Sequence, residues 1–254
     1  MAREFQCAFL SQKYPAFPHD ASAKESALQF CCSYRPSGTL GGDFYDILSL
    51  SETETGVFIC DVMGHGVRAA LVTGIIRGLV EELKPVGRDP GKFITEINRS
   101  LGGVLRQTDT TMFASAFYLT LDAATGRMRY INAGHPSPLV LQRGAENVSA
   151  FTWNGSGYGP VLGLFEDTVY QPQERQLAAG DAVLLYTDGL FEVPGVDGEE
   201  YGQDRLAAAV RCRLHMPFDR LIPEVVGEVE AFGGSKDFED DVCLVGVDLA
   251  RLLK

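Results

Sequence analysis

Four acidic motifs stand at the ends of four short apolar runs, and this arrangement strongly limits how the chain can fold. In chain order the motifs are GGDFYD (Asp43 and Asp46), DVMGHG (Asp61), TDG (Asp188) and EDD (Asp240 and Asp241). Short apolar runs of this kind are typical of buried strands. Carboxylates at the ends of such strands can meet on one edge of a sheet, so the sequence predicts a layered protein with an acidic edge.

The spacing of the first two motifs supports this convergence. The residues on either side of the polar turn SETETG have the pattern of two strands. In an antiparallel pair the start of one strand lies beside the end of the next, so Asp43 and Asp61 are expected to share one edge. Asp188 closes a strand and Asp240 opens one, so both reach that edge if their strands also run antiparallel.

A cluster of this kind needs a counter-charge. Several ionised carboxylates disfavour one another's charged form unless a cation lies between them. Ligand sets made only of oxygen suit Mg²⁺ or Mn²⁺. The pattern therefore predicts a divalent cation site.

The remaining periodicity indicates an α+β sandwich. Strands are expected at 28–34, 44–50, 57–60, 112–121, 128–132, 139–141, 169–177, 182–186 and 242–248. Helices are expected at 5–14, 67–83, 90–106, 203–213 and 219–232, with Asp89 and Asp219 as caps of two of them. The helix 67–83 carries two apolar rows, one with Leu71 and one with Val72, and both need cover from the rest of the fold.

Composition limits the class of protein. The chain has 254 residues, 45% of them hydrophobic, and a formal net charge of −12, which argues against nucleic acid as a partner. No apolar run approaches the length of about 18 residues that crosses a membrane. The six cysteines show no CxxC spacing, so we expect reduced thiols and a cytoplasmic protein. We expect one domain over 1–254, with a helical N-terminal extension at about 1–27.

Six sequence blocks, in one order, resemble a known family. The blocks are YRPSGTLGGDFYDI, FICDVMGHGVRAAL, TTMFASAFYLTLDAATGRMRYINAGHPSPLVL, GPVLGL, LAAGDAVLLYTDGLFEV and EDDVCLVGVDL. Together they resemble the SpoIIE/RsbU-type branch of the PPM metal-dependent serine/threonine protein phosphatases. The resemblance runs from about Tyr34 to Asp248. It implies the PPM fold, in which two stacked antiparallel β-sheets are flanked by helices.

The resemblance also implies a role for each acidic motif. Two Mn²⁺ or Mg²⁺ ions would be held by Asp43, Asp61, the backbone carbonyl of Val62, Asp188 and Asp240. Asp61 would bridge the two ions, and Asp43, Asp61 and Asp188 would serve catalysis through a metal-activated water. A register shift of one residue would put Asp241 in place of Asp240 as the last ligand.

Three other side chains are candidates for places near the site. Asp46 follows Asp43 by three residues and is equally consistent with a solvated or hydrogen-bonded strand residue. The eukaryotic branch of the family carries a histidine two residues after the bridging aspartate, but that position is Met63 here, so a proton-donor role for His65 is not inherited. Arg68, which opens the helix after the DVMGHG motif, is a candidate for holding phosphate.

The implied activity is hydrolysis of phosphoserine and phosphothreonine in a protein. The resemblance implies an anti-anti-sigma (STAS-type) protein as substrate, in bacterial partner-switching signalling, and an upstream sensor domain or regulator. A homodimer is consistent with the same reading. Two alternatives stay open: a catalytically silent module that docks a STAS-type partner, and a phosphatase of small phosphoesters.

Overall fold

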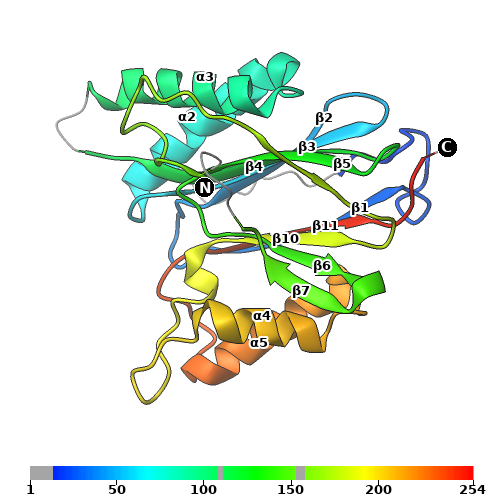
Figure 1. Cartoon of the computed structure of the whole chain (residues 1–254). Helices are drawn as coiled ribbons and strands as arrows, with labels where there is room; N and C mark the ends of the chain where they lie inside the picture. Colours follow the sequence, from blue (N-terminus) through cyan, green and yellow to red (C-terminus); the bar gives the residue numbers. More distant parts are fainter. Residues whose placement is uncertain (1–13, 108–110, 153–157, 254) are drawn as a thin grey trace.

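Two β-sheets lie face to face in the computed structural model, which describes residues 14–107, 111–152 and 158–253 (Figure 1). The five-stranded sheet has the order β1 (Leu28–Arg35), β11 (Val242–Leu249), β10 (Ala182–Tyr186), β6 (Leu139–Gln142) and β7 (Asn147–Ala150). The six-stranded sheet has the order β2 (Phe44–Ser49), β3 (Glu54–Val62), β4 (Ala114–Asp122), β5 (Arg127–Ala133) and β8 (Tyr158–Gly159), with β9 (Gln173–Gln176) also on β5. All these pairings are antiparallel except that of β5 with β8.

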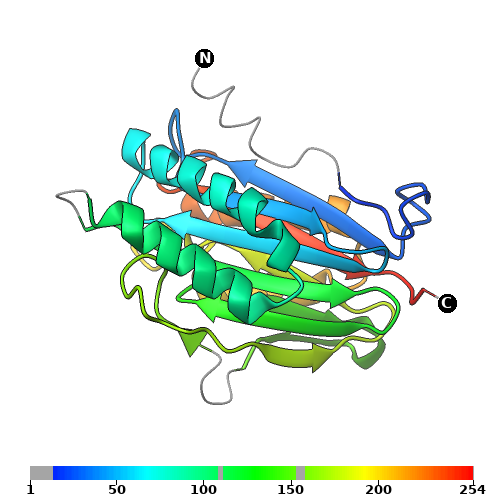
Figure 2. The same ribbon diagram turned by 90° about the horizontal axis from the view of Figure 1, so that it is seen from above.

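Helices cover the outer face of each sheet. α2 (Val67–Leu83) and α3 (Pro90–Leu105) lie over the six-stranded sheet, as Figure 2 shows from above, and α4 (Gly202–Cys212) and α5 (Phe218–Gly233) lie over the other. Short 3-10 turns are η1 (Lys84–Val86), η2 (Arg143–Ala145) and η3 (Asp188–Leu190). This is the predicted sandwich of two sheets flanked by helices.

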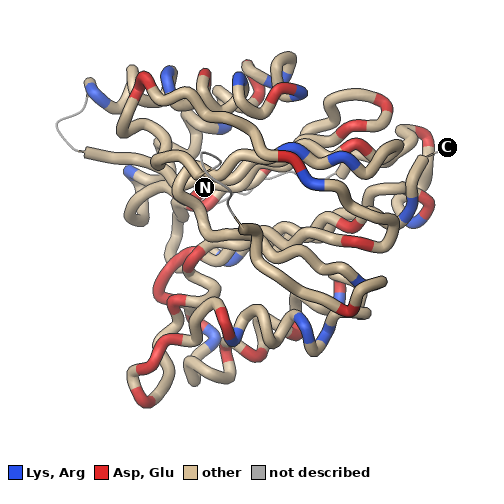
Figure 3. The backbone as a smooth tube through the Cα atoms, in the orientation of Figure 1, with Lys and Arg blue, Asp and Glu red and all other residues tan. Residues whose placement is uncertain are grey.

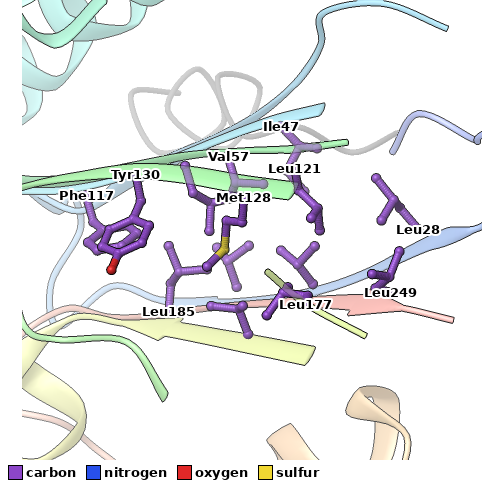
Figure 4. Packing of buried hydrophobic residues seen from close by; sticks show 14 of the residues in the cluster. Leu28, Ile47, Val57, Phe117, Leu121, Met128, Tyr130, Leu177, Leu185 and Leu249 are labelled. Carbon is purple, nitrogen blue, oxygen red and sulfur yellow. The ribbon is translucent and has the colours of Figure 1, made fainter. Parts of the chain in front are cut away.

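The alternation of residues along each strand produces three apolar layers. On β3, Ile59 points between the sheets, whereas Phe58 and Cys60 point toward α2 and α3. In the layer between the sheets, the aromatic residues Phe117 and Tyr130 lie beside aliphatic side chains from both sheets (Figure 4). A third layer packs α4 and α5 against the five-stranded sheet. The two sheets are therefore fixed face to face, which in turn fixes how their edges meet.

Most predicted elements are confirmed, with differences that have physical causes. The helix at 67–83 and the Asp89 cap are as expected, and the Asp89 side chain accepts from the Lys92 amide. Asp219, however, is not a cap, because Pro217 occupies that position and Asp219 lies in the first turn. The strand expected at 169–177 shortens to β9, and the short strands β7 and β8 had no recognisable pattern.

The N-terminal extension differs most from expectation. The helix predicted at 5–14 falls almost wholly outside the described residues, and residues 14–27 form turns instead of a helix. Pro15 and Pro18 disfavour a helix there. Phe17 and Ala27 are fully buried in the layer between the sheets, so this segment closes one side of the sandwich.

Charge is distributed unevenly over the surface. Figure 3 shows acidic positions gathered along the segment that leads into β11 and along the loop that follows η3. Within the described part of the chain, no helix combines the length and the apolarity needed to cross a bilayer.

Candidate active site at one edge of the sandwich

The β2–β3 hairpin places Asp43 beside Asp61. Phe44 pairs with Cys60 in the antiparallel register, so the preceding Asp43 lies next to Asp61 at the same edge. Asp43 is almost completely buried, with 2% of its surface exposed, and Asp61 is half-buried. The Asp43 side chain lies near enough to act on the pKa of Asp61. The convergence expected from the sequence is therefore present.

The β10–β11 pair brings the other two carboxylates to this edge. Tyr186 pairs with Leu244, and the Thr187 amide donates to the Cys243 carbonyl at 3.1 Å. Asp188 thus leaves β10 just where Asp240 approaches β11. Since the strands run antiparallel, the condition stated for these two residues is met.

Thr187 joins the two sheets at the site. Its hydroxyl donates to Asp43 Oδ2 at 2.7 Å, and the same oxygen accepts from the Cys243 amide at 2.9 Å. Thr187 is fully buried. The motif TDG contains this residue, but nothing in its local pattern reveals that its hydroxyl reaches a carboxylate in the other sheet.

Asp241 holds the loop that carries Asp43. Its Oδ1 accepts from the Ser37 amide at 2.7 Å and from the Ser37 hydroxyl at 3.1 Å, and its Oδ2 accepts from the Gly42 amide at 2.5 Å. Asp241 is 2% exposed, whereas Asp240 is exposed and its Oδ1 accepts from the Asp241 amide at 2.7 Å. Because both oxygens of Asp241 serve the loop, Asp240 is the residue whose carboxylate is left for a ligand.

Glycines permit these close approaches. A Cβ atom at Gly189 would collide with the Asp241 carbonyl, and one at Gly41 would collide with the Asp241 carboxylate. A Cβ atom at Gly42 would lie 2.7 Å from the carbonyl oxygen of Val62. The Val62 carbonyl, predicted as a ligand, therefore lies directly against the Asp43 loop.

Burial, together with the charges of neighbouring carboxylates, raises the pKa values of Asp43, Asp61 and Asp188. Burial is the largest cause at Asp61 and, with the charges of Asp188 and Asp240, raises its pKa to about 7. Burial first and the Asp61 charge second raise the pKa of Asp43 well above its usual value. The pKa of Asp188 is also raised, by burial and then by Asp240. Each carboxylate thus disfavours the ionised form of its neighbours.

The donor set fits a divalent cation. In the described part of the chain none of the four carboxylates forms an ion pair with Lys, Arg or His, so their mutual repulsion has no compensation from the protein. No three His, Cys, Asp or Glu side chains among the described residues are close enough to form a closed cation cage. The carboxylates are nevertheless near enough to one another that their charges raise the pKa values of Asp43, Asp61 and Asp188. The site therefore brings oxygen ligands to one edge of the sandwich, but their side chains do not form a closed cage around one cation position.

The remaining predicted site residues lie outside the carboxylate cluster. Asp46 is buried on the helix-facing side of β2, where it pairs with Arg77 of α2 at 2.8 Å, so it does not join the cluster. His65 and Arg68 are exposed in the loop and first helical turn that follow Asp61. Gly64 and Gly66 in this loop adopt φ values of +81° and +82°, which favour glycine.

The fold matches that of PP2C-type phosphatase domains, and comparison with known proteins identifies the family. The profile described as Stage II sporulation protein E (SpoIIE) matches residues 51–250. The chain therefore belongs to the SpoIIE family.

Several relatives show how far the similarity extends. The phosphoserine phosphatase RsbP of Bacillus subtilis (strain 168) is 32% identical over 161 residues, which cover 63% of this chain and 38% of RsbP. The crystal structure of the RsbU and RsbW domains of Rv1364c from Mycobacterium tuberculosis has a TM-score of 0.73 at 27% identity, over 87% of this chain and 59% of that one. The SiaA-PP2C domain of Pseudomonas aeruginosa has a TM-score of 0.80 at 23% identity, over 96% of this chain and 93% of that one, and shows the fold alone. The chain spans less than half the length of the curated relatives it matches.

Proposed function

We propose that this chain is a metal-dependent protein phosphatase that hydrolyses phosphoserine and phosphothreonine. The observation that carries the proposal is the group of four carboxylates, drawn from both sheets to one edge, whose charges have no compensating ion pair among the described residues. Membership of the SpoIIE family and similarity to phosphoserine phosphatases support the same activity.

The residues at this edge have two roles: some would bind the ions, and others keep the ion-binding residues in position. Asp43, Asp61, Asp188, Asp240 and the Val62 carbonyl would hold two Mn²⁺ or Mg²⁺ ions. Bound ions of this kind lower the pKa of water and stabilise charge on phosphoryl oxygens. Asp43 and Asp61 bind as anions, so they release their protons on loading. Thr187 and Asp241 keep Asp43 in place through the hydrogen bonds described above.

We propose one basic protein side chain that contacts the substrate phosphate. Arg68 is exposed at the start of α2, close in sequence to Asp61, and is the basic side chain we propose to contact the phosphate or its flanking residues. Since phosphoryl transfer depends on positioning and charge stabilisation, no covalent intermediate with the protein is required.

The proposed substrate is a phosphorylated STAS-type anti-anti-sigma protein. The relatives named RsbP and RsbU are phosphoserine phosphatases, and one structural neighbour combines RsbU and RsbW domains in one chain. We also propose that a sensor domain or a separate regulator, and association of two copies, control the activity in the cytoplasm.

A phosphate-release assay tests the function and separates it from the alternatives. The purified chain is incubated with a phosphorylated STAS-type protein, a phosphoserine peptide or para-nitrophenyl phosphate, with Mn²⁺ or with excess chelator. We expect Mn²⁺-dependent release from the phosphoprotein that chelator abolishes. Release only from para-nitrophenyl phosphate would instead indicate a phosphatase of small phosphoesters. Binding of the phosphoprotein without release would indicate a silent docking module.

A further inference from the structure

A half-buried serine on the strand next to Asp61 forms a pair with a buried histidine. Asp61 of β3 pairs with Ser115 of β4 in the antiparallel register. His135, which follows β5, has its Nδ1 atom 2.7 Å from the Ser115 hydroxyl oxygen. Neither Ser115 nor His135 takes part in the chemistry proposed above.

Strand alternation puts Ser115 on the same face as Asp61. Ile59 and Phe117, two residues before Asp61 and two after Ser115, both point into the layer between the sheets. Side chains at i and i+2 share a face, so Asp61 and Ser115 point there too. The Cβ atoms of directly opposed residues lie about 4.5–5.5 Å apart, which places the Ser115 hydroxyl within reach of the Asp61 carboxylate and of anything bound to it.

The backbone of His135 is held rigidly. Its amide donates to Asn132 Oδ1 at 2.7 Å, and its carbonyl accepts from Asn132 Nδ2 at 2.8 Å. The preceding Gly134 adopts φ +74° and has no room for a Cβ atom against Val161. The ring therefore has little freedom to leave Ser115.

The environment of His135 indicates which ring nitrogen carries the proton. Burial lowers the pKa of His135 to about 3, so the imidazole is neutral. Nε2 of His135 is buried, and no group in the described part of the chain forms a hydrogen bond of good geometry with it. The backbone of Tyr186, in the facing sheet, is nevertheless near enough to the ring to stabilise a proton on it. Since Nδ1 is taken by Ser115, that proton belongs on Nε2. Nδ1 is then an acceptor, and Ser115 donates to it.

We propose that Ser115 is a further oxygen ligand group of the site and that His135 is its positioning residue. The Ser115 hydroxyl proton is committed to His135 Nδ1, so the free lone pairs of the oxygen face the side of Asp61. An oxygen in this orientation accepts a hydrogen bond from cation-bound water or contacts the cation itself. It does not stabilise a bare Asp61 carboxylate, and the hydrogen bond that lowers the pKa of Asp61 indeed comes from Asp43. The role rests on the proposed function, because it takes Asp61 as a cation ligand.

Mn²⁺ binding measured by calorimetry, without substrate, tests the proposal. We expect Ser115→Ala to weaken the affinity at least about 10-fold, the usual effect of removing a group that supports a metal ligand. Ser115→Thr keeps the hydroxyl and fits a strand, so it should restore most of the affinity. His135→Leu should weaken binding in the wild-type background and have no further effect in the Ser115→Ala background, because it acts through Ser115.

Controls separate this role from plain packing. Tyr186→Phe removes the hydrogen bond of 2.7 Å from the Tyr186 hydroxyl to the Ser137 carbonyl, close to the same loop, and should lower thermal stability with no change in Mn²⁺ affinity. Equal Mn²⁺ affinity of wild type and Ser115→Ala, or additive effects of Ser115→Ala and His135→Leu, would overturn the proposal alone. A wild-type chain that binds no Mn²⁺ would overturn the proposed function as well.

Nuclear magnetic resonance provides a second test on the metal-free wild type. The ¹⁵N shifts of His135 should show protonated Nε2 and unprotonated Nδ1, unchanged between about pH 5 and pH 8, the range in which an ordinary histidine titrates. Protonated Nδ1, or a ring that titrates in this range, would contradict the assignment because Ser115 could then donate to Asp61.

Discussion

The two ends of β3 carry buried acidic residues in opposite electrostatic settings. At its start, Glu54 is 7% exposed and pairs with Arg88 at 2.7 Å and with Arg129 at 3.5 Å. Near its end, Asp61 meets other carboxylates, and no ion pair compensates it in the described part of the chain. At the Glu54 end of β3 the protein itself supplies the compensating positive charge, whereas at the Asp61 end an added cation must supply it.

The comparison distinguishes a structural carboxylate from a functional one. Both residues stand near strand ends, Glu54 buried and Asp61 half-buried, so position and burial alone do not explain their different roles. Their neighbours do, because a protein keeps uncompensated buried charge only at some cost in stability. Asp46, on the neighbouring strand, follows the Glu54 pattern, since Arg77 pairs with it.

The largest effect is expected from Asp61→Asn. This substitution keeps the shape of the side chain and removes the charge that would hold a cation. Hydrolysis should fall at least about 100-fold, because charge stabilisation by metal ions contributes several kcal/mol. The melting temperature in chelator should stay equal or rise, since carboxylate repulsion is relieved. Phosphate release and thermal unfolding measure both quantities, and near-normal turnover would place the chemistry elsewhere.

Asp241→Ala should cause the next largest effect, on stability. It leaves the buried Gly42 amide without its acceptor, at a cost of about 1–3 kcal/mol, and also removes the acceptor of the amide of the exposed residue Ser37. Its neighbour Asp240 is the matched control, because Asp240→Ala removes an exposed carboxylate and should change the free energy of unfolding by less than about 1 kcal/mol. Urea denaturation in chelator tests the difference. Equal destabilisation by the two substitutions would show that Asp241 does not hold the loop.

How stability depends on pH should distinguish the two ends of β3 further. The folded-state pKa of Asp61 is about 7, above its unfolded value, so the folded chain binds more protons than the unfolded chain between those pKa values. Its contribution to stability is therefore complete below the unfolded pKa and is lost as the pH rises toward 7. Asp43 and Asp188, whose pKa values are also raised, act in the same direction.

Thermal unfolding of wild type and Asp61→Asn in chelator measures this contribution. The melting temperature of Asp61→Asn minus that of wild type should increase between about pH 4 and pH 7, because only wild type loses the Asp61 contribution. Saturating Mn²⁺ should reduce the loss in wild type, since a bound cation favours the ionised carboxylates. A difference that stays constant with pH would show that Asp61 is not crowded by its neighbours.

Local pattern was enough to predict the acidic edge, because each acidic motif stands at a strand end and antiparallel pairing brings those ends together. The links between distant segments were not predictable. Thr187 and Asp43 are 144 positions apart and meet because the two sheets stack, whereas Asp241 and Ser37, 204 positions apart, meet because β1 pairs with β11 in one sheet. The pairing of Ser115 with His135 depends on the register of β4 against β5.

Helix α2 illustrates a limit of periodicity. The sequence has two apolar rows, and both were expected to be covered, but Leu71 is 66% exposed whereas Val72 and Ile76 are buried. Ile75 and Leu79 are half-buried against the apolar layer under the helices. An apolar pattern predicts which residues can be buried, but the rotation of the helix on the sheet decides which row is covered.

The smallest effect is expected at the compensated end of β3. Glu54→Gln leaves the guanidinium groups of Arg88 and Arg129 without their anionic partner. Arg88 is 65% exposed and Arg129 28% exposed, so water replaces much of the lost attraction, and the free energy of unfolding should fall by only about 1–2 kcal/mol. The Mn²⁺ concentration for half-maximal phosphatase rate should not change, because the site lies at the other end of the strand. A changed Mn²⁺ dependence would mean that the charges at the two ends of β3 are coupled, and the division between a structural end and a functional end would fail.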